Sequence, residues 1–322
     1  MNFIILQKRK PKVIDLFAGC GGMSLGFENA GYEIVAAFDN WDAAINVYRQ
    51  NFTHPIFKQD LAIIQDYTTF QHLRPDVIIG GPPCQDFSHA GKRDENGGRA
   101  DLTISFAEIV CAVQPQFFVM ENVERAITTQ RYKAAMAMFH KAGYGLTLRV
   151  LDASYCGVPQ KRKRSFLIGG LGERESFLQA YLDAGLSQQA MTVRQYFQEE
   201  LGFLPNTEFY YRHPRNYSRR AVYTLDEPSA TIRGVNRPIP PNYAQHSIDA
   251  ASLSEGVRPL TTHERACIQT FPLNFQFSGT KSDMEQMIGN AVPVRLAEFV
   301  AHALQMYKNN VHLLTQQTEL FA

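Results

Sequence analysis

The chain has 322 residues, of which 45% are hydrophobic and 20% charged, and its net charge is +1. This length can bury a large core and leaves room for two domains. No apolar run approaches the roughly 20 residues that cross a bilayer, and the basic residues after the short apolar start reverse the order of a secretory signal. We therefore expect a cytoplasmic protein with no membrane partner. Its five scattered cysteines form neither a disulfide framework nor a zinc pattern, so we expect reduced thiols and no metal.

Short apolar strands alternate with helical stretches in the first half of the chain. Strands are predicted at residues 13–17, 34–38, 77–79, 117–120 and 166–168. Helices are predicted through residues 25–27 and at 41–52, 104–113 and 132–142. This alternation indicates an α/β fold with a doubly wound, mainly parallel sheet.

The character of the sequence changes after about Gly172. From there to about Ser254 the chain is rich in Tyr, Arg, Pro and Asn and lacks a sustained helix–strand alternation. The proline-rich residues 238–243 are unsuited to a central strand. Helical pattern returns at residues 262–271 and 293–307. We therefore predict a catalytic and cofactor-binding domain (1–172), a smaller irregular domain with short β elements (173–271), and a C-terminal segment (272–322) that completes the first domain.

A single thiol follows two consecutive prolines at the end of the apolar run 77–79. The prolines fix their own φ angles and restrict the residue before each of them, so the backbone that enters Cys84 has few conformations available. A rigid turn that carries a thiol suggests a positioned nucleophile. A tight turn with a small buried cysteine is an equally good interpretation of this segment by itself.

Residues 15–22 (DLFAGCGG) read as a strand, a glycine-rich turn and the start of a helix. Such a turn lets a ligand lie against backbone N–H groups at a helix N-terminus. Asp39 ends the second strand and is placed to accept hydrogen bonds from ribose hydroxyls. Trp41 is the only tryptophan and could stack on an adenine ring, although core packing is its ordinary role. Asp60 could end a third strand and accept from an exocyclic amine.

Glu121 follows the apolar strand 117–120 directly, so its carboxyl group is expected at the edge of the sheet where ligands bind. Partial burial there favours the protonated carboxyl, which can supply a proton while a thiol attacks. A helix cap or an ion pair is the alternative. Gln160, Arg162 and Arg164 alternate, so in an extended segment they point to one side.

Arginine is concentrated in the irregular region. Six arginines stand against two acidic residues between positions 209 and 243, and residues 161–164 are all basic. Local basic surface on a nearly neutral chain fits a protein that touches phosphate on one face. Ordinary solvated arginine is the alternative for either cluster alone.

Together these motifs resemble those of the DNA cytosine-C5 methyltransferases of bacterial restriction–modification systems. The resemblance covers nearly the whole chain outside about 172–257. It rests on the ordered motifs DLFAGCGG, GGPPCQDFS, ENV, QKRKR, RPLTTHERACIQTFP and QMIGNAVPVRLA, and on the acidic site that includes Trp41. It implies a Rossmann-like fold that uses S-adenosylmethionine and yields S-adenosylhomocysteine, with residues 286–296 folded back beside the first strand.

The resemblance also implies roles for individual residues. Cys84 would attack C6 of a flipped-out cytosine, Glu121 would hold N3 and the exocyclic amine, and Arg164 would contact the base. Arg162 matches a contact near the flipped phosphate. Asn40 stands where the family commonly has a glutamate, which leaves the ribose contact to Asp39. The expected cofactor-binding residues are Phe17, Gly19, Gly21, Gly22, Asp39, Asn40, Trp41, Asp60, Pro82, Asn290 and Val292.

DNA contacts are expected in two segments. Residues 85–101 are polar and glycine-bearing, and we expect them to close over DNA as a lid; a solvated loop is the alternative. Residues 227–234 resemble the Thr-plus-aliphatic element of the family's target-recognition domain, and arginines there could read guanine. The expected DNA-binding residues are Gln85, Ser88, Lys92, Arg99, Gln160, Thr231, Ile232, Arg233 and Arg237.

The leading hypothesis is a monomeric, sequence-specific methyltransferase acting on double-stranded DNA, with a cognate restriction endonuclease that recognises the same site. A tRNA cytosine methyltransferase on the same scaffold is the first alternative. That subgroup usually carries a Cys-Phe-Thr tripeptide near residues 267–269, where this chain has Cys-Ile-Gln. The second alternative is a catalytically silent DNA-binding regulator, against which the intact Cys84, Glu121 and Arg164 argue.

Overall fold

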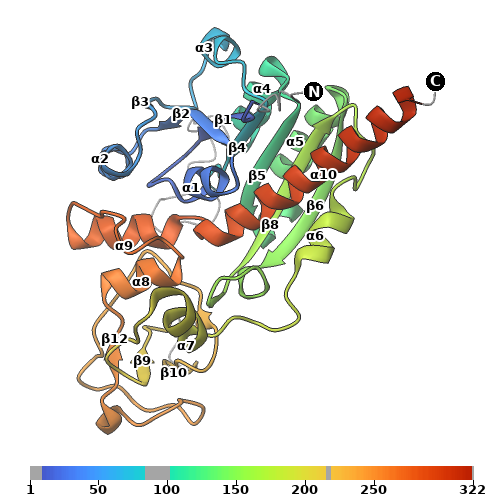
Figure 1. Cartoon of the computed structure of the whole chain (residues 1–322). Coiled ribbons are helices and arrows are strands. Elements are labelled where there is room, and N and C mark those ends of the chain that lie inside the picture. Colours follow the sequence, from blue (N-terminus) through green and yellow to red (C-terminus); the bar gives the residue numbers. More distant parts are fainter. Residues whose placement is uncertain (1–8, 84–101, 215–218, 321–322) are drawn as a thin grey trace, which may run out of the picture.

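The computed structural model describes residues 9–83, 102–214 and 219–320, and a large sheet dominates it (Figure 1). Its seven strands run in the order β3-β2-β1-β4-β5-β8-β6. The first five are parallel, and β8 is antiparallel to both of its neighbours. The strands are β1 (Lys12–Leu16), β2 (Glu33–Asp39), β3 (Ile56–Lys58), β4 (Val77–Gly80), β5 (Phe117–Val123), β6 (Tyr144–Asp152) and β8 (Lys163–Leu171). This confirms the predicted doubly wound, mainly parallel α/β fold.

Helices cover both faces of the sheet because its strands alternate between two apolar layers. Val13 points into one layer and its neighbour Ile14 into the other. The first layer is covered by α1 (Gly22–Asn29), α6 (Gln179–Gly185) and α10 (Val294–Leu320). The second is covered by α3 (Thr68–His72), α4 (Leu102–Val113) and α5 (Gln130–Lys141). The helix α2 (Asp42–Asn51) packs beyond β2.

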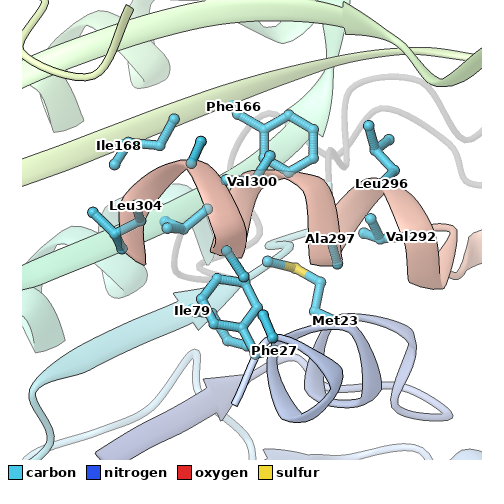
Figure 2. Packing of buried hydrophobic residues seen from close by; sticks show 14 of the residues in the cluster. Met23, Phe27, Ile79, Phe166, Ile168, Val292, Leu296, Ala297, Val300 and Leu304 are labelled. Carbon is cyan, nitrogen blue, oxygen red and sulfur yellow. The ribbon is translucent and has the colours of Figure 1, made fainter. Parts of the chain in front are cut away.

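The helix α10 lies between α1 and the strand β8 (Figure 1). That residues 272–322 complete the first domain stays a prediction. Figure 2 shows Met23 and Phe27 of α1 on one side of α10 and Phe166 and Ile168 of β8 on the other. The described part of the chain contains no helix that is both long and apolar enough for a membrane.

Gly26 sets the close approach of α1 to α10. A Cβ atom built there would lie 2.5 Å from the carbonyl oxygen of Val294 and 2.7 Å from the backbone nitrogen of Glu298. A Cβ on Gly185 would instead meet the side chain of Phe299 at 2.9 Å, and a side chain can shift. Both glycines are helical, where alanine is intrinsically favoured by about 1 kcal/mol.

We expect Gly26→Ala to lower the free energy of unfolding by about 2 kcal/mol or more, because overpacking against backbone outweighs the helix preference. Gly185→Ala should change it by less than about 1 kcal/mol. Urea denaturation of both variants measures the difference. Equal effects of the two substitutions would contradict the role given to Gly26.

A smaller, irregular part carries a three-stranded sheet in the order β10-β9-β12. Its elements are α7 (Val193–Tyr196), β9 (Phe209–Tyr211), β10 (Val222–Thr224), β11 (Ser229–Ala230), β12 (Arg258–Pro259), α8 (Thr262–Ile268) and α9 (Lys281–Asn290). The strand β11 pairs with β7 (Gln160–Lys161), which precedes β8. The boundaries at 172 and 271 stay predictions. Phe177, Leu178 and Leu182, just after the first of them, pack in the same layer as α10.

Candidate active site and nucleic-acid groove

A cavity of about 520 Å³ opens at the carboxyl ends of β1, β2, β4 and β5. In doubly wound sheets this edge is where ligands bind. The cavity joins residues that are far apart in the sequence but were expected at one site. Its lining includes Phe17, Gly19, Gly22, Asp39, Asn40, Trp41, Asp60, Pro82, Glu121, Arg162, Arg164, Asn290 and Val292. Gly21 lies behind this wall, where its φ of 96° starts α1.

The glycine-rich turn is fixed by Asp39. One carboxylate oxygen accepts the backbone N–H of Gly19 at 2.8 Å, and the other accepts that of Trp41 at 2.8 Å. Phe17 and Gly19 have φ angles of 60° and 56°, a strained region for a phenylalanine. Burial raises the pKa of Asp39, and its backbone hydrogen bonds oppose that rise. Asp39 therefore holds the turn after β1 against the end of β2.

A chain of hydrogen bonds leads from the cavity toward the surface. Ser24 Oγ donates to Asp15 Oδ2 at 2.6 Å and lies 2.7 Å from the Tyr48 hydroxyl. That hydroxyl lies 2.6 Å from His54 Nε2, and His54 Nδ1 lies 3.1 Å from Glu28 Oε1. Asp15 lines the cavity and is only 1% exposed. Burial raises its pKa to about 7.

Asp15 is a site residue that the sequence reasoning missed. The signal was present, because Asp15 is the one charged residue within the apolar strand 13–17. A carboxyl group in the middle of a buried strand is costly unless it is hydrogen-bonded. Such a group is therefore a candidate for a binding site.

Glu121 forms the opposite wall of the cavity. Its Oε1 lies 3.0 Å from Arg164 Nε, and the residue is 8% exposed. Burial raises the pKa of the Glu121 carboxyl, and the charges of Arg164 and Arg162 only partly offset this. A Cβ on Gly81 would lie 3.1 Å from Glu121 Oε2, so the glycine lets the carboxyl group lie against this turn. A buried carboxyl group with a raised pKa thus faces the cavity.

Asn122 ties the acid to the proline turn. Its Nδ2 donates to the carbonyl oxygen of Pro82 at 3.0 Å. Pro82 and Pro83 both line the cavity, so the turn that leads to Cys84 is part of the same wall as Glu121. Cys84 itself and the other candidates of that segment lie outside the described residues, namely Gln85, Ser88, Lys92 and Arg99.

Arg162 and Arg164 line the same cavity, as their alternate spacing predicted, whereas Gln160 is not part of its lining. Gln160 and Arg162 are 0% and 2% exposed. The amide group of Gln160 and the two Nη atoms of Arg162 bind groups within the protein, including both the N–H and the C=O of Ile232. Ile232 is itself 4% exposed. Direct contact of Gln160, Arg162 and Ile232 with DNA therefore stays a prediction, and their internal bonds do not favour it.

A wider groove of about 1100 Å³ adjoins the cavity, and its lining is rich in arginine from both the large sheet domain and the irregular part. Arg125, Arg164 and Asn290 line both spaces, so the groove leads into the cavity. Among the residues that line the groove, Thr231, Arg233 and Arg237 are predicted DNA contacts. Arg212, Arg219 and Arg220 line it as well. Arginine-rich concave surface of this size suits the phosphate backbone of a nucleic acid.

The groove arginines differ in how they are held. Arg212 donates through Nε and Nη2 to the carbonyl oxygen of Thr231, and Arg233 donates to that of His213. Arg237 is exposed at the groove wall. Burial and the charges of Arg237, Arg233 and Arg212 lower the pKa of His213, so this imidazole is held neutral among cations.

The sheet order with a reversed strand next to the last, the glycine-rich turn after β1 and the cavity at the strand ends define a Rossmann-like fold with a ligand site. The family model "C-5 cytosine-specific DNA methylase" matches residues 11–306, and the chain belongs to this family. It is thus a DNA cytosine-C5 methyltransferase, for which the family and fold imply S-adenosylmethionine as methyl donor and double-stranded DNA as substrate.

Named relatives cover almost the whole chain. The chain is 58% identical to the Type II methyltransferase M.HgiDI of Herpetosiphon aurantiacus over 92% of this chain and 95% of that protein. It is 57% identical to the Type II methyltransferase M.HindV of Haemophilus influenzae over 91% and 96%. Among solved structures, S. pombe Dnmt2 methyltransferase covers 94% of this chain and 99% of its own (TM-score 0.68, 15% identity). A putative DNA modification methyltransferase of an E. coli prophage covers 93% and 100% (TM-score 0.66, 22% identity), and both share the fold.

Proposed function

We propose that this enzyme methylates C5 of a cytosine flipped out of duplex DNA, through a covalent bond between Cys84 and C6. The observation that carries the proposal is the single cavity that has Glu121 and Arg164 on one wall and the Asp39-fixed turn on the other. A base must leave the stack to reach such a site, and DNA methyltransferases are among the base-flipping enzymes.

Each step has a group to support it. The Cys84 thiolate adds to C6, and the electron pair moves toward C5 while Glu121 donates a proton to N3. C5 then takes the methyl group. Loss of the C5 proton to water and return of the N3 proton to Glu121 allow the thiolate to leave, which restores the neutral ring. Arg164 orients Glu121 and contacts the base.

The cavity's composition fits S-adenosylmethionine, which supplies an electrophilic methyl group when bound. The carboxylates of Asp15 and Asp39 suit a ligand that carries cationic groups. Glycine at position 22 is required by space, because a Cβ there would lie 2.3 Å from the carbonyl oxygen of Val292. Trp41 offers an aromatic surface to the adenine. The remaining proposed cofactor contacts are Phe17, Gly19, Asn40, Asp60, Pro82, Asn290 and Val292.

We assign the basic groove to duplex DNA, with phosphate contacts that position the duplex and base contacts that specify the site. Arg237 is our first choice for reading a base, since it is exposed at the groove wall. Two relatives bear the name Type II methyltransferase. We therefore infer a monomeric, cytoplasmic enzyme that protects host DNA from a cognate restriction endonuclease.

Transfer of labelled methyl groups to unmethylated duplex DNA and to tRNA tests this function. We expect incorporation into DNA alone, and none with the Cys84→Ser variant. Bisulfite sequencing of DNA from cells that express the enzyme would identify the target cytosine. Incorporation into tRNA but into no DNA would overturn the proposal.

A further inference from the structure

A buried polar cluster lies between the cofactor cavity and the basic groove. It consists of Gln160, Arg162 and Gln269, which we call the joint. Their exposed fractions are 0%, 2% and 0%, yet all three side chains are polar. Buried polar groups of this kind are costly unless their hydrogen bonds are satisfied.

On the groove side the joint binds both backbone polar groups of Ile232. This residue belongs to residues 231–237, which we call the recognition segment. Gln160 Oε1 accepts the backbone N–H of Ile232 at 2.8 Å, and Arg162 Nη1 donates to the carbonyl oxygen of Ile232 at 3.0 Å. Its neighbour Thr231 donates from Oγ1 to the carbonyl oxygen of Lys161 at 2.7 Å. Thr231 and Ile232 also line the groove.

On the cavity side the same residues hold the turn between α9 and α10. Gln160 Nε2 donates to Gln269 Oε1 at 2.7 Å, and Gln269 Nε2 donates to the carbonyl oxygen of Ala291 at 3.0 Å. Arg162 Nη2 donates to the carbonyl oxygens of Gly289 and Ala291 at 3.1 and 3.0 Å. Residues 289–292 all line the cofactor cavity.

The backbone on the cavity side and the backbone on the groove side are in direct contact at Gly289. A Cβ on Gly289 would lie 2.2 Å from the backbone carbon of Arg233 and 2.2 Å from the backbone nitrogen of Gly234. A shift of the cavity turn must therefore move the recognition segment or break buried hydrogen bonds. Packing alone would be served by apolar side chains, whereas Arg162 binds backbone on both sides and the bonded pair of Gln160 and Gln269 binds backbone on one side each.

We propose that Gln160, Arg162 and Gln269 are positioning residues that couple cofactor occupancy of the cavity to the order of residues 231–237 at the groove. The inference rests on the function proposed for the cavity. When a ligand fixes residues 289–292, opening of the joint becomes rarer, and the Ile232 N–H is released less often. Because such coupling is reciprocal, a duplex that fixes residues 231–237 must strengthen cofactor binding by the same factor.

Hydrogen exchange of the whole enzyme with and without S-adenosylhomocysteine tests the coupling. In the wild type we expect the product to slow exchange at Ile232 by about fivefold or more, the lower range of ordinary coupling. In Gln269→Met and Gln160→Met the slowing should fall below about twofold. Gln116→Met is the matched control, because Gln116 is exposed and its side chain, among the described contacts, bonds only to the carbonyl oxygen of Leu171.

Calorimetry with S-adenosylhomocysteine separates the possible failures. Absence of binding to the wild type would overturn the function proposed for the cavity. Binding that leaves exchange at Ile232 unchanged in the wild type would overturn the coupling alone, whether or not the variants fold. If the three residues had only a structural role, exchange at Ile232 would be faster in the variants, and the product would not change that exchange in the wild type.

Discussion

Replacement of Glu121 by glutamine is expected to lower kcat for methyl transfer by about 10²–10⁴-fold, the usual contribution of a positioned acid. Glutamine has nearly the same size, but it holds no transferable proton and loses the charge that pairs with Arg164. Affinity for S-adenosylhomocysteine should stay within about threefold, since the glycine-rich turn is fixed by Asp39 on the other wall. Single-turnover methylation and product binding measure the two quantities.

The pH dependence of kcat gives an independent check on Glu121. Its pKa is raised by burial, and the protonated form is the active one, so kcat should fall as the pH rises through that pKa. The charge of Arg164 lowers the pKa of Glu121. In Arg164→Met the fall of kcat with rising pH should therefore occur at higher pH than in the wild type, and the reaction should also be slower. If kcat fell at the same pH in this variant as in the wild type, the result would argue against a protonated Glu121.

Asp15→Asn should stabilise the protein at pH 8 and have little effect near pH 4. The pKa of Asp15 is raised from 3.8 to about 7, so the folded protein holds this proton more tightly than the unfolded chain. Stability is therefore lost as the pH rises from about 4 through about 7. Three pKa units correspond to an upper limit on the order of 4 kcal/mol. Thermal denaturation of both proteins across this pH range measures the gain.

Glu264→Gln is the matched control with the opposite sign. Burial raises the pKa of Glu264, but hydrogen bonds from Arg258 and Thr261 outweigh it and the net direction is downward. This substitution should destabilise the protein at pH 7, and the difference should narrow as the pH falls below about 4. If both variants changed stability in the same direction at pH 8, the ionisation of Asp15 would not be the cause.

Much of the fold follows from local pattern. Apolar strands before Glu121 and Asp39 could be recognised in the sequence, and parallel strands end at a common edge. Their meeting at one cavity was therefore predictable. The edge strand β6 was not predicted, because Thr147 and Arg149 interrupt its apolar pattern. The helix α9 was not predicted either, because its sequence is mostly polar and it is held by Met287 and Ile288, which pack in the apolar cluster of the irregular part.

The joint shows where local pattern fails. Alternation at Gln160, Arg162 and Arg164 predicted a common side, yet only Arg162 and Arg164 line the cavity, and Gln160 is buried outside its lining. The strand β7 ends after Lys161, where β11 from far along the chain pairs with it. Burial of Gln160 and Arg162 depends on that distant partner and on Gln269. No feature of residues 160–164 alone reports those contacts.

The contact between α1 and α10 also constrains synthesis of the enzyme. Tyr32 donates its hydroxyl hydrogen to the carbonyl oxygen of Ala301, and the two residues are 269 positions apart. The apolar face of α1 thus stays uncovered until α10 has left the ribosome, and contacts of such long range form slowly. A nascent chain that already carries Cys84 and Glu121 lacks a finished core. We therefore expect activity only from chains in which α10 has been synthesised, and we expect chaperones to bind the uncovered face of α1 before then.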